Sequence, residues 1–150
     1  MKIISGGQTG VDRGALRAAR AMGFPHGGWC PKGRLAEDGP IDASFHLTET
    51  DSAEYAIRTE KNVLDSDGTL ILHRGRLSGG TLLTLRLAQQ HSRPHMVVDL
   101  NAPCPMHEIL WWIEEEQIET LNVAGPRESQ NPGIEAGAEE FVRGLFEAIE

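Results

Sequence analysis

Cysteine is scarce in the sequence. The two cysteines, Cys30 and Cys104, show no C-x-x-C or mixed Cys/His spacing, and the six histidines show no spacing typical of metal ligands. Neither a disulfide framework nor a zinc site is indicated, so two free thiols are expected.

Long hydrophobic runs are also missing. No stretch approaches 18 consecutive apolar residues, and the N-terminus enters Lys2-Ile3-Ile4 directly. The sequence therefore predicts no transmembrane helix and no signal peptide. We expect a cytoplasmic protein without membrane partners.

Basic residues are fewer than acidic ones. The chain has 14 Lys and Arg against 22 Asp and Glu, which gives a net charge of −8. This balance disfavours sequence-independent contact with DNA, RNA or an anionic membrane. An anionic ligand would need local capture by backbone N–H groups and a few arginines, because short-range hydrogen bonds outweigh a screened distant field.

The chain alternates short β-rich runs with amphipathic stretches. Its 150 residues fit one compact domain, and no repeat or linker indicates a second. Alternating strands and helices favour parallel strands joined by crossover helices. We predict a single α/β domain over residues 1–150, a Rossmann-like three-layer sandwich with a mainly parallel sheet. The predicted strands are Lys2–Ser5, Gly68–His73, His95–Leu100 and Ile118–Ala124.

Five helices are predicted from apolar residues at the 3.6-residue period. They cover Asp12–Met22, Ser52–Leu64, Thr81–His91, the stripe from Met106 to Ile113 and the stripe from Ala138 to Ile149. In the second helix, the residues expected to be buried are Ala53, Ala56, Ile57, Val63 and Leu64. The segment Phe24–Leu47 has no sustained period and is predicted to be a long loop with one short strand.

The strongest functional signal is the run Ser5–Arg13, which follows the first strand and opens the first helix. Its glycines allow close backbone approach, and a helix N-terminus offers N–H donors to a phosphate. The run matches neither the nucleoside triphosphate phosphate loop nor G-x-G-x-x-G. A purely structural turn, with Asp12 as a cap or first-turn acid, is the alternative. The candidate ligand-binding residues are Gly6, Gly7, Gln8, Thr9, Gly10 and Asp12.

Two more loops follow predicted strands. One contains Ser78, Gly79, Gly80 and Thr81, and the other is Gly125–Ser129. In an open parallel sheet, loops after adjacent strands can converge on one ligand. Arg127, in the last loop, would supply a bidentate charge contact or else be an exposed turn residue.

The segment Pro31–Gly39 carries two cations, Lys32 and Arg34, and two adjacent carboxylates, Glu37 and Asp38. It is predicted to close over the ligand. The carboxylates would orient a base or a magnesium ion, although nothing else in the sequence indicates Mg²⁺, or they are simply solvated. Trp29 would stack on a flat ring or pack at the loop base, whereas Trp111 and Trp112 suit core or subunit packing.

Taken together, Ile4–Arg13, Cys30–Gly39, Arg58–Ile71 and Leu121–Arg127 resemble the putative molybdenum carrier family. That family is a circularly permuted, YpsA-like branch of the SLOG superfamily of Rossmann-like proteins. The resemblance implies a ligand-binding protein that holds molybdenum cofactor, a phosphorylated pterin, as cargo and needs no metal ligand of its own. It adds Arg58 to the candidate anion partners Lys32, Arg34 and Arg127.

The sequence also resembles the phosphoribohydrolases that cleave a nucleoside monophosphate. Arg58 fills their arginine position, but Thr84 stands where they have a glutamate. A hydroxyl titrates too high to act as the carboxylate base. Either the chemistry is lost, which we favour, or Asp12, Glu37 or Asp38 has taken over. A nucleotide-sensing regulatory protein is a third possibility. Related folds pair through helices beside the sheet, so a homodimer or higher homo-oligomer is expected.

Overall fold

The computed structural model describes residues 1–150 and contains a five-stranded, wholly parallel sheet. The strand order is β2-β1-β9-β7-β8. These strands are β1 (Lys2–Ile4), β2 (His26–Gly27), β7 (Gly68–His73), β8 (His95–Asp99) and β9 (Thr120–Ala124). The predicted α/β class and mainly parallel sheet are confirmed.

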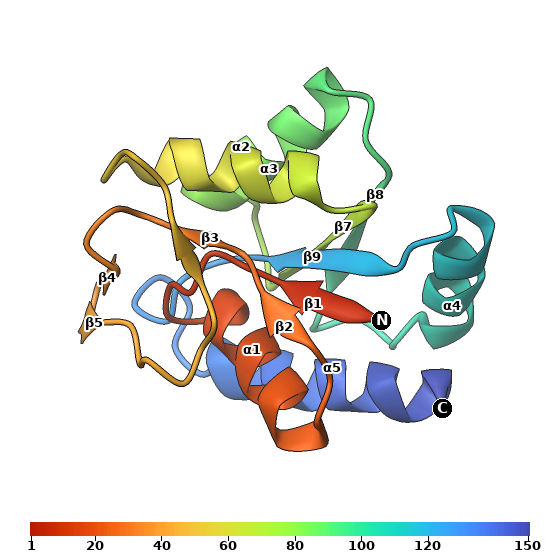
Figure 1. The fold of residues 1–150 in the computed structure, drawn as a ribbon. Helices are drawn as coiled ribbons and strands as arrows, with labels where there is room; N and C mark the ends of the chain where they lie inside the picture. Colours follow the sequence, from red (N-terminus) through yellow and green to blue (C-terminus); the bar gives the residue numbers. More distant parts are fainter.

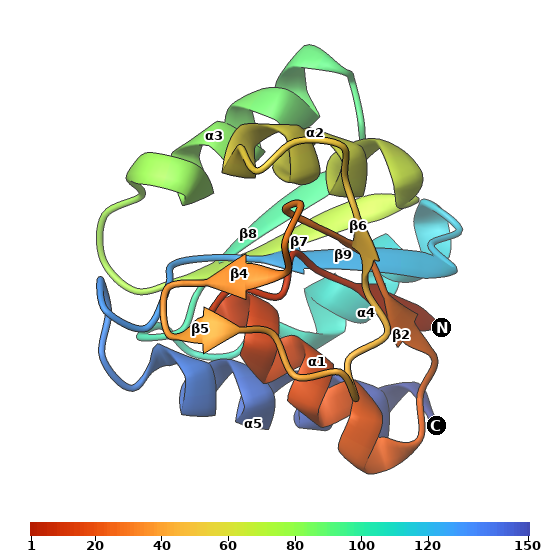
Figure 2. The same cartoon turned by 60° about the vertical axis from the view of Figure 1, so that its left-hand side comes forward.

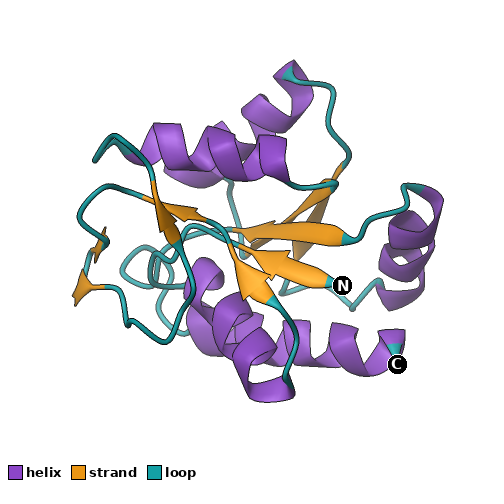
Figure 3. Ribbon diagram, viewed as in Figure 1, coloured by secondary structure: helices purple, strands orange, loops and turns teal.

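Helices cover both faces of the sheet and give three layers (Figures 1 and 3). One outer layer consists of α2 (Tyr55–Asp65) and α3 (Gly79–Gln90). The opposite layer consists of α1 (Val11–Met22), α4 (Met106–Glu115) and α5 (Ile134–Ile149). All five helices lie where the apolar periodicity predicts them, with ends shifted by a few residues.

The main core lies between the sheet and the layer of α1, α4 and α5. It contains 18 buried apolar residues, including Val11 of α1, Ile109 of α4 and Phe146 of α5. Trp112 belongs to this core, whereas Trp111, the next residue of α4, has 65% of its surface exposed. The opposite face has a much smaller cluster of Val63, Leu87 and Ala88. This asymmetry leaves polar side chains between the sheet and α2 and α3.

The segment Phe24–Leu47 is more structured than predicted. It contains four two-residue strands, of which β2 joins the edge of the main sheet. The others are β3 (Trp29–Cys30), which pairs with β6 (Thr48–Glu49), and the antiparallel pair β4 (Leu35–Ala36) and β5 (Gly39–Pro40). Strands of two residues are too short to show an alternating pattern, which is why the prediction of one strand was wrong.

The buried face of α2 also differs from the prediction. Val63 is buried as expected, but Ala53 lies outside the helix, and Ala53, Ala56, Ile57 and Leu64 are all exposed. The inward face instead presents Thr59 and Asn62. The Asn62 side chain holds the backbone of Trp29 in β3 through hydrogen bonds of 2.8 and 3.0 Å. Helix α2 therefore turns a polar face inward, which hydrophobic periodicity cannot detect.

Candidate functional site

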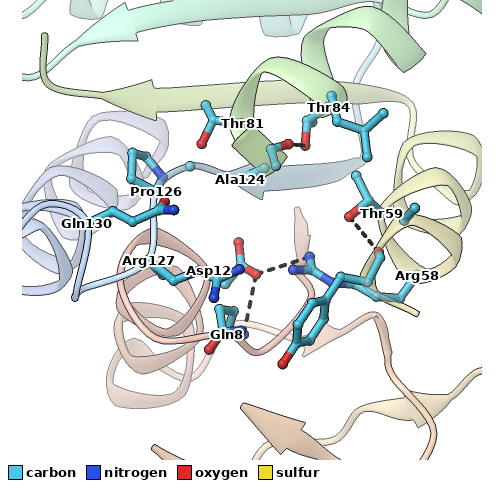
Figure 4. A pocket seen from close by; sticks show the side chains of 15 residues that line it. Gln8, Asp12, Arg58, Thr59, Thr81, Thr84, Ala124, Pro126, Arg127 and Gln130 are labelled. Carbon is cyan, nitrogen blue, oxygen red and sulfur yellow. Dashed lines mark hydrogen bonds and ion pairs between the residues drawn. The ribbon is translucent and has the colours of Figure 1, made fainter. Parts of the chain in front are cut away.

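A polar cavity lies where the loops after β1, β7 and β9 meet α2 and α3 (Figure 4). These three strands are neighbours in the sheet, so their carboxyl ends open at one edge. The cavity encloses about 70 Å³, whereas pockets for whole drug-sized ligands span roughly 300–1,000 Å³. Its enclosed part therefore suits one small group of a ligand. The lining residues are Gln8, Asp12, Tyr55, Ala56, Arg58, Thr59, Gly80, Thr81, Leu83, Thr84, Ala124, Gly125, Pro126, Arg127 and Gln130.

Asp12 and Arg58 form an ion pair within this cavity (Figure 4). Arg58 Nη1 lies 3.2 Å from Asp12 Oδ2, and both side chains are largely buried. Burial raises the pKa of the Asp12 carboxyl, and the charge of Arg58 opposes that rise. Gly6 makes room for the guanidinium, because a Cβ at this position would lie 1.9 Å from Arg58 Nη1. The absence of a side chain at Gly6 thus leaves room for the ion pair between Arg58 and Asp12.

The first glycine-rich loop is hydrogen-bonded to the protein itself. The N–H groups of Gly7 and Gln8 donate to Ser5 and Asp12 side chains, and that of Thr9 donates to the Gln8 side chain. Further along, Gly10 donates to Glu135 Oε1 at 3.0 Å, and Val11 donates to the carbonyl of Pro126 at 3.1 Å. The backbone donors expected to hold a phosphate are therefore occupied from Gly7 to Val11.

The side chain of Gln8 is the exception in this loop. Its Oε1 accepts hydrogen bonds from the N–H groups of Thr9 and Glu37, at 3.0 and 2.8 Å. Its Nε2 has no hydrogen-bond partner, although Gln8 is only 6% exposed and lines the cavity. Buried polar groups are normally paired, because an unpaired donor costs about 1–3 kcal/mol. Gln8 Nε2 is thus a buried donor without a partner, on a residue that lines the cavity.

The N-terminus of α3 has free backbone donors. The N–H groups of Gly79, Gly80 and Thr81 have no acceptor in the protein, and the N-cap Ser78 makes no side-chain capping bond. Gly80 and Thr81 line the cavity. Uncapped N–H groups and the helix dipole favour an anion at this position. The second predicted loop therefore has free backbone donors at the cavity, whereas those of the first loop are occupied from Gly7 to Val11.

The cavity is positively charged within an acidic protein. Its charged lining residues are Arg58, Arg127 and Asp12, so the local charge is positive even when Asp12 is ionised. The chain as a whole has a net charge of −8. Local cations and N–H groups thus make the cavity favourable to an anion although the overall charge is negative.

Comparison with known proteins identifies the family of the chain. A sequence profile of the circularly permutated YpsA SLOG family matches residues 3–146. The chain belongs to the circularly permutated YpsA SLOG family. The chain is also similar to a crystal structure described as a putative molybdenum carrier protein from Syntrophus aciditrophicus SB. The sequence identity is 44%, the TM-score is 0.91, and the match covers 96% of this chain and 93% of that chain. A search of curated proteins finds no match.

The family predicted from the sequence is therefore confirmed. Residues of the three predicted loops line the polar cavity. Thr84 lines that cavity, and its hydroxyl donates to the carbonyl of Gly80 at 2.9 Å. The Thr84 side chain thus completes a bond within its own helix (Figure 4).

Glu37 and Asp38 lie outside the cavity, at the turn between β4 and β5 (Figure 2). Glu37 accepts hydrogen bonds from the hydroxyls of Thr9 and Ser129, and these lower the pKa of its carboxyl. Asp38 pairs with Arg13, whose hydrogen bonds likewise lower the pKa of the aspartate. Glu37 thus fastens the β4–β5 turn to two loops near the cavity, and Asp38 fastens it to helix α1.

The remaining predicted residues lie away from the cavity. Arg34 donates to the carbonyls of Leu47, Ile41, Asp42 and Phe45, and Lys32 is exposed. Trp29 donates its indole N–H to Asp65, the last residue of α2, and lies under Lys61. No group of three or more His, Cys, Asp or Glu side chains is arranged to hold a metal ion. No helix is long and apolar enough to cross a membrane.

Several cavity residues were not predicted. Tyr55 and Thr59 flank Arg58 on α2, and Gln130 follows the loop that contains Arg127. The spacing of three residues between Tyr55 and Arg58 is the one available signal, because residues three apart on a helix are neighbours. Gln130 has no such signal, since its position depends on the path of the loop.

Proposed function

We propose that this cavity binds the phosphate of a phosphorylated small molecule, nucleotide-like or pterin. The phosphate would accept hydrogen bonds from the N–H groups of Gly80 and Thr81, from Gln8 Nε2 and from Arg127. The observation that carries the proposal is the coincidence of uncapped N–H groups with a buried, unpaired amide donor in one cavity. Such a donor set is complementary to a phosphate.

We propose further that the protein carries its ligand unchanged, with molybdenum cofactor as cargo. The name of the Syntrophus protein supports this reading. Thr84, bonded to its own helix, supplies no acid or base at the position that the hydrolytic relatives use. The small enclosed volume would hold the phosphate, and the pterin would lie at the open mouth, so the metal would need no protein ligand.

Calorimetric titration with a pterin monophosphate and with the same pterin lacking its phosphate tests the proposal. The phosphorylated compound is expected to bind, and the other to bind at least tenfold more weakly. The phosphorylated compound should be recovered unchanged by mass spectrometry after incubation. Equal binding of the two compounds would overturn the phosphate site, and conversion of the ligand would overturn the carrier role.

A second candidate, a phosphoribohydrolase-like enzyme, is favoured by one observation. Asp12 and Arg58 form a buried carboxylate–guanidinium pair within the cavity. In this reaction water adds across the N-glycosidic bond, which releases the base and ribose 5-phosphate. The test is adenine release from adenosine monophosphate, measured by chromatography. Release that disappears in Arg58→Ala would establish hydrolysis in place of carriage, and no release from the wild-type protein would remove this candidate.

A further inference from the structure

Tyr55 is the one aromatic ring that lines the cavity. It is the only tyrosine in the chain and the first residue of α2. Tyr55 is 38% exposed. The enclosed part of the cavity is polar, so Tyr55 offers an apolar surface on which the rest of a ligand would lie.

Two arginines lie over the ring of Tyr55 at long range. The guanidinium carbons of Arg58 and Arg127 lie 5.7 and 5.6 Å from its centroid. In the two other cation–π contacts of the chain, Lys61 to Trp29 and Arg20 to Phe45, these distances are 4.4 and 4.3 Å. Both cavity arginines therefore stand more than 1 Å farther from the ring than the protein's close contacts do.

We infer that Tyr55 is a stacking subsite for a planar heterocycle, so that the ligand combines a phosphate with an aromatic ring. This inference rests on the proposed phosphate site. Half-exposed aromatic rings at a ligand site gain apolar contact and ring–ring interactions when a flat ring is placed against them. The nearby arginines would add cation–π attraction to the face of such a ring. A sugar phosphate alone would leave the Tyr55 subsite empty.

The Tyr55 subsite is tested by titrating adenosine monophosphate, a pterin monophosphate and ribose 5-phosphate into four proteins by calorimetry. These are the wild type, Tyr55→Leu, Tyr55→Phe and Trp111→Leu. Leucine removes the aromatic ring while leaving apolar bulk, and phenylalanine keeps the ring. Trp111 is an exposed aromatic residue of α4 that does not line the cavity, so its variant is the matched control.

Tyr55→Leu should weaken the better-bound ring ligand by about tenfold to hundredfold, the range of base–aromatic stacking. Ribose 5-phosphate affinity should stay within about twofold, and Tyr55→Phe and Trp111→Leu should bind all three compounds like the wild type. Unchanged ring-ligand affinity in Tyr55→Leu, or an equal loss for ribose 5-phosphate, would overturn the stacking subsite alone. Failure of all three compounds to bind the wild type would overturn the proposed phosphate site, and the inference with it.

Discussion

Gly80 allows the phosphate site to be perturbed without disturbing the fold. A Cβ added there meets no heavy atom within 4 Å, and the residue has no positive φ. In Gly80→Asp, a negative charge would stand among the N–H groups proposed to hold the phosphate. At roughly 5 Å and an effective dielectric constant of about 20, the repulsion between two unit charges is about 3 kcal/mol. The dissociation constant should therefore rise by about two orders of magnitude.

The same substitution should not destabilise the protein. An acidic residue in the first turn of a helix gains about 0.3–1 kcal/mol from the helix dipole, and Gly80 lies in the first turn of α3. Calorimetry with ribose 5-phosphate and thermal denaturation would measure the two effects. Gly80→Asn is the isosteric neutral control and should keep affinity within about tenfold. Equal losses of affinity in both variants, or retained affinity in Gly80→Asp, would refute the reasoning.

Three further predictions concern the residues around the cavity. Gly6→Ala should displace Arg58 from its pair with Asp12 and lower the free energy of unfolding by about 1–3 kcal/mol, measured by urea denaturation. The pKa of Glu37 lies below its ordinary value of 4.5, so its contribution to stability is present above pH 4.5 and lost as pH falls through the lowered pKa. The protection factor of the Ser129 amide, which donates to Glu37, should fall over that acidic range in the wild type and not in Glu37→Gln, as measured by hydrogen exchange. Arg34→Ala should lower the melting temperature, because its guanidinium binds four carbonyls, and leave ribose 5-phosphate affinity unchanged.

The sheet and helices were predictable because their burial follows simple periods. Strand β7 (Gly68–His73) is buried almost throughout and has the predicted bounds, and α5 carries a regular apolar stripe. Strand β2 was not predictable, because its two residues are too few to show a period, and the next residue, Gly28, lies close to Ser5. A Cβ on Gly28 would lie 2.2 Å from the Ser5 carbonyl oxygen. A contact of this kind depends on tertiary structure, which local composition does not encode.

The site was predictable in its loops and less so in its individual donors. Residues of the glycine-rich runs after β1 and β7 line one cavity together with Arg127. The sequence cannot show that Gly10 donates its N–H to the side chain of Glu135, which is 125 residues further along the chain. Nor can it show that the Arg34 guanidinium donates to backbone carbonyls, whereas the Gln8 side-chain Nε2 has no hydrogen-bond partner. Which donors are free depends on long-range hydrogen bonds, and these decide where a phosphate would bind.

Native mass spectrometry of the protein purified without dialysis tests the central claim most directly. A phosphorylated small molecule should accompany the wild-type protein and should be absent from Gly80→Asp purified in the same way. The bound molecule should also contain a planar heterocycle. A co-purified ligand without phosphorus, or one retained equally by Gly80→Asp, would contradict it.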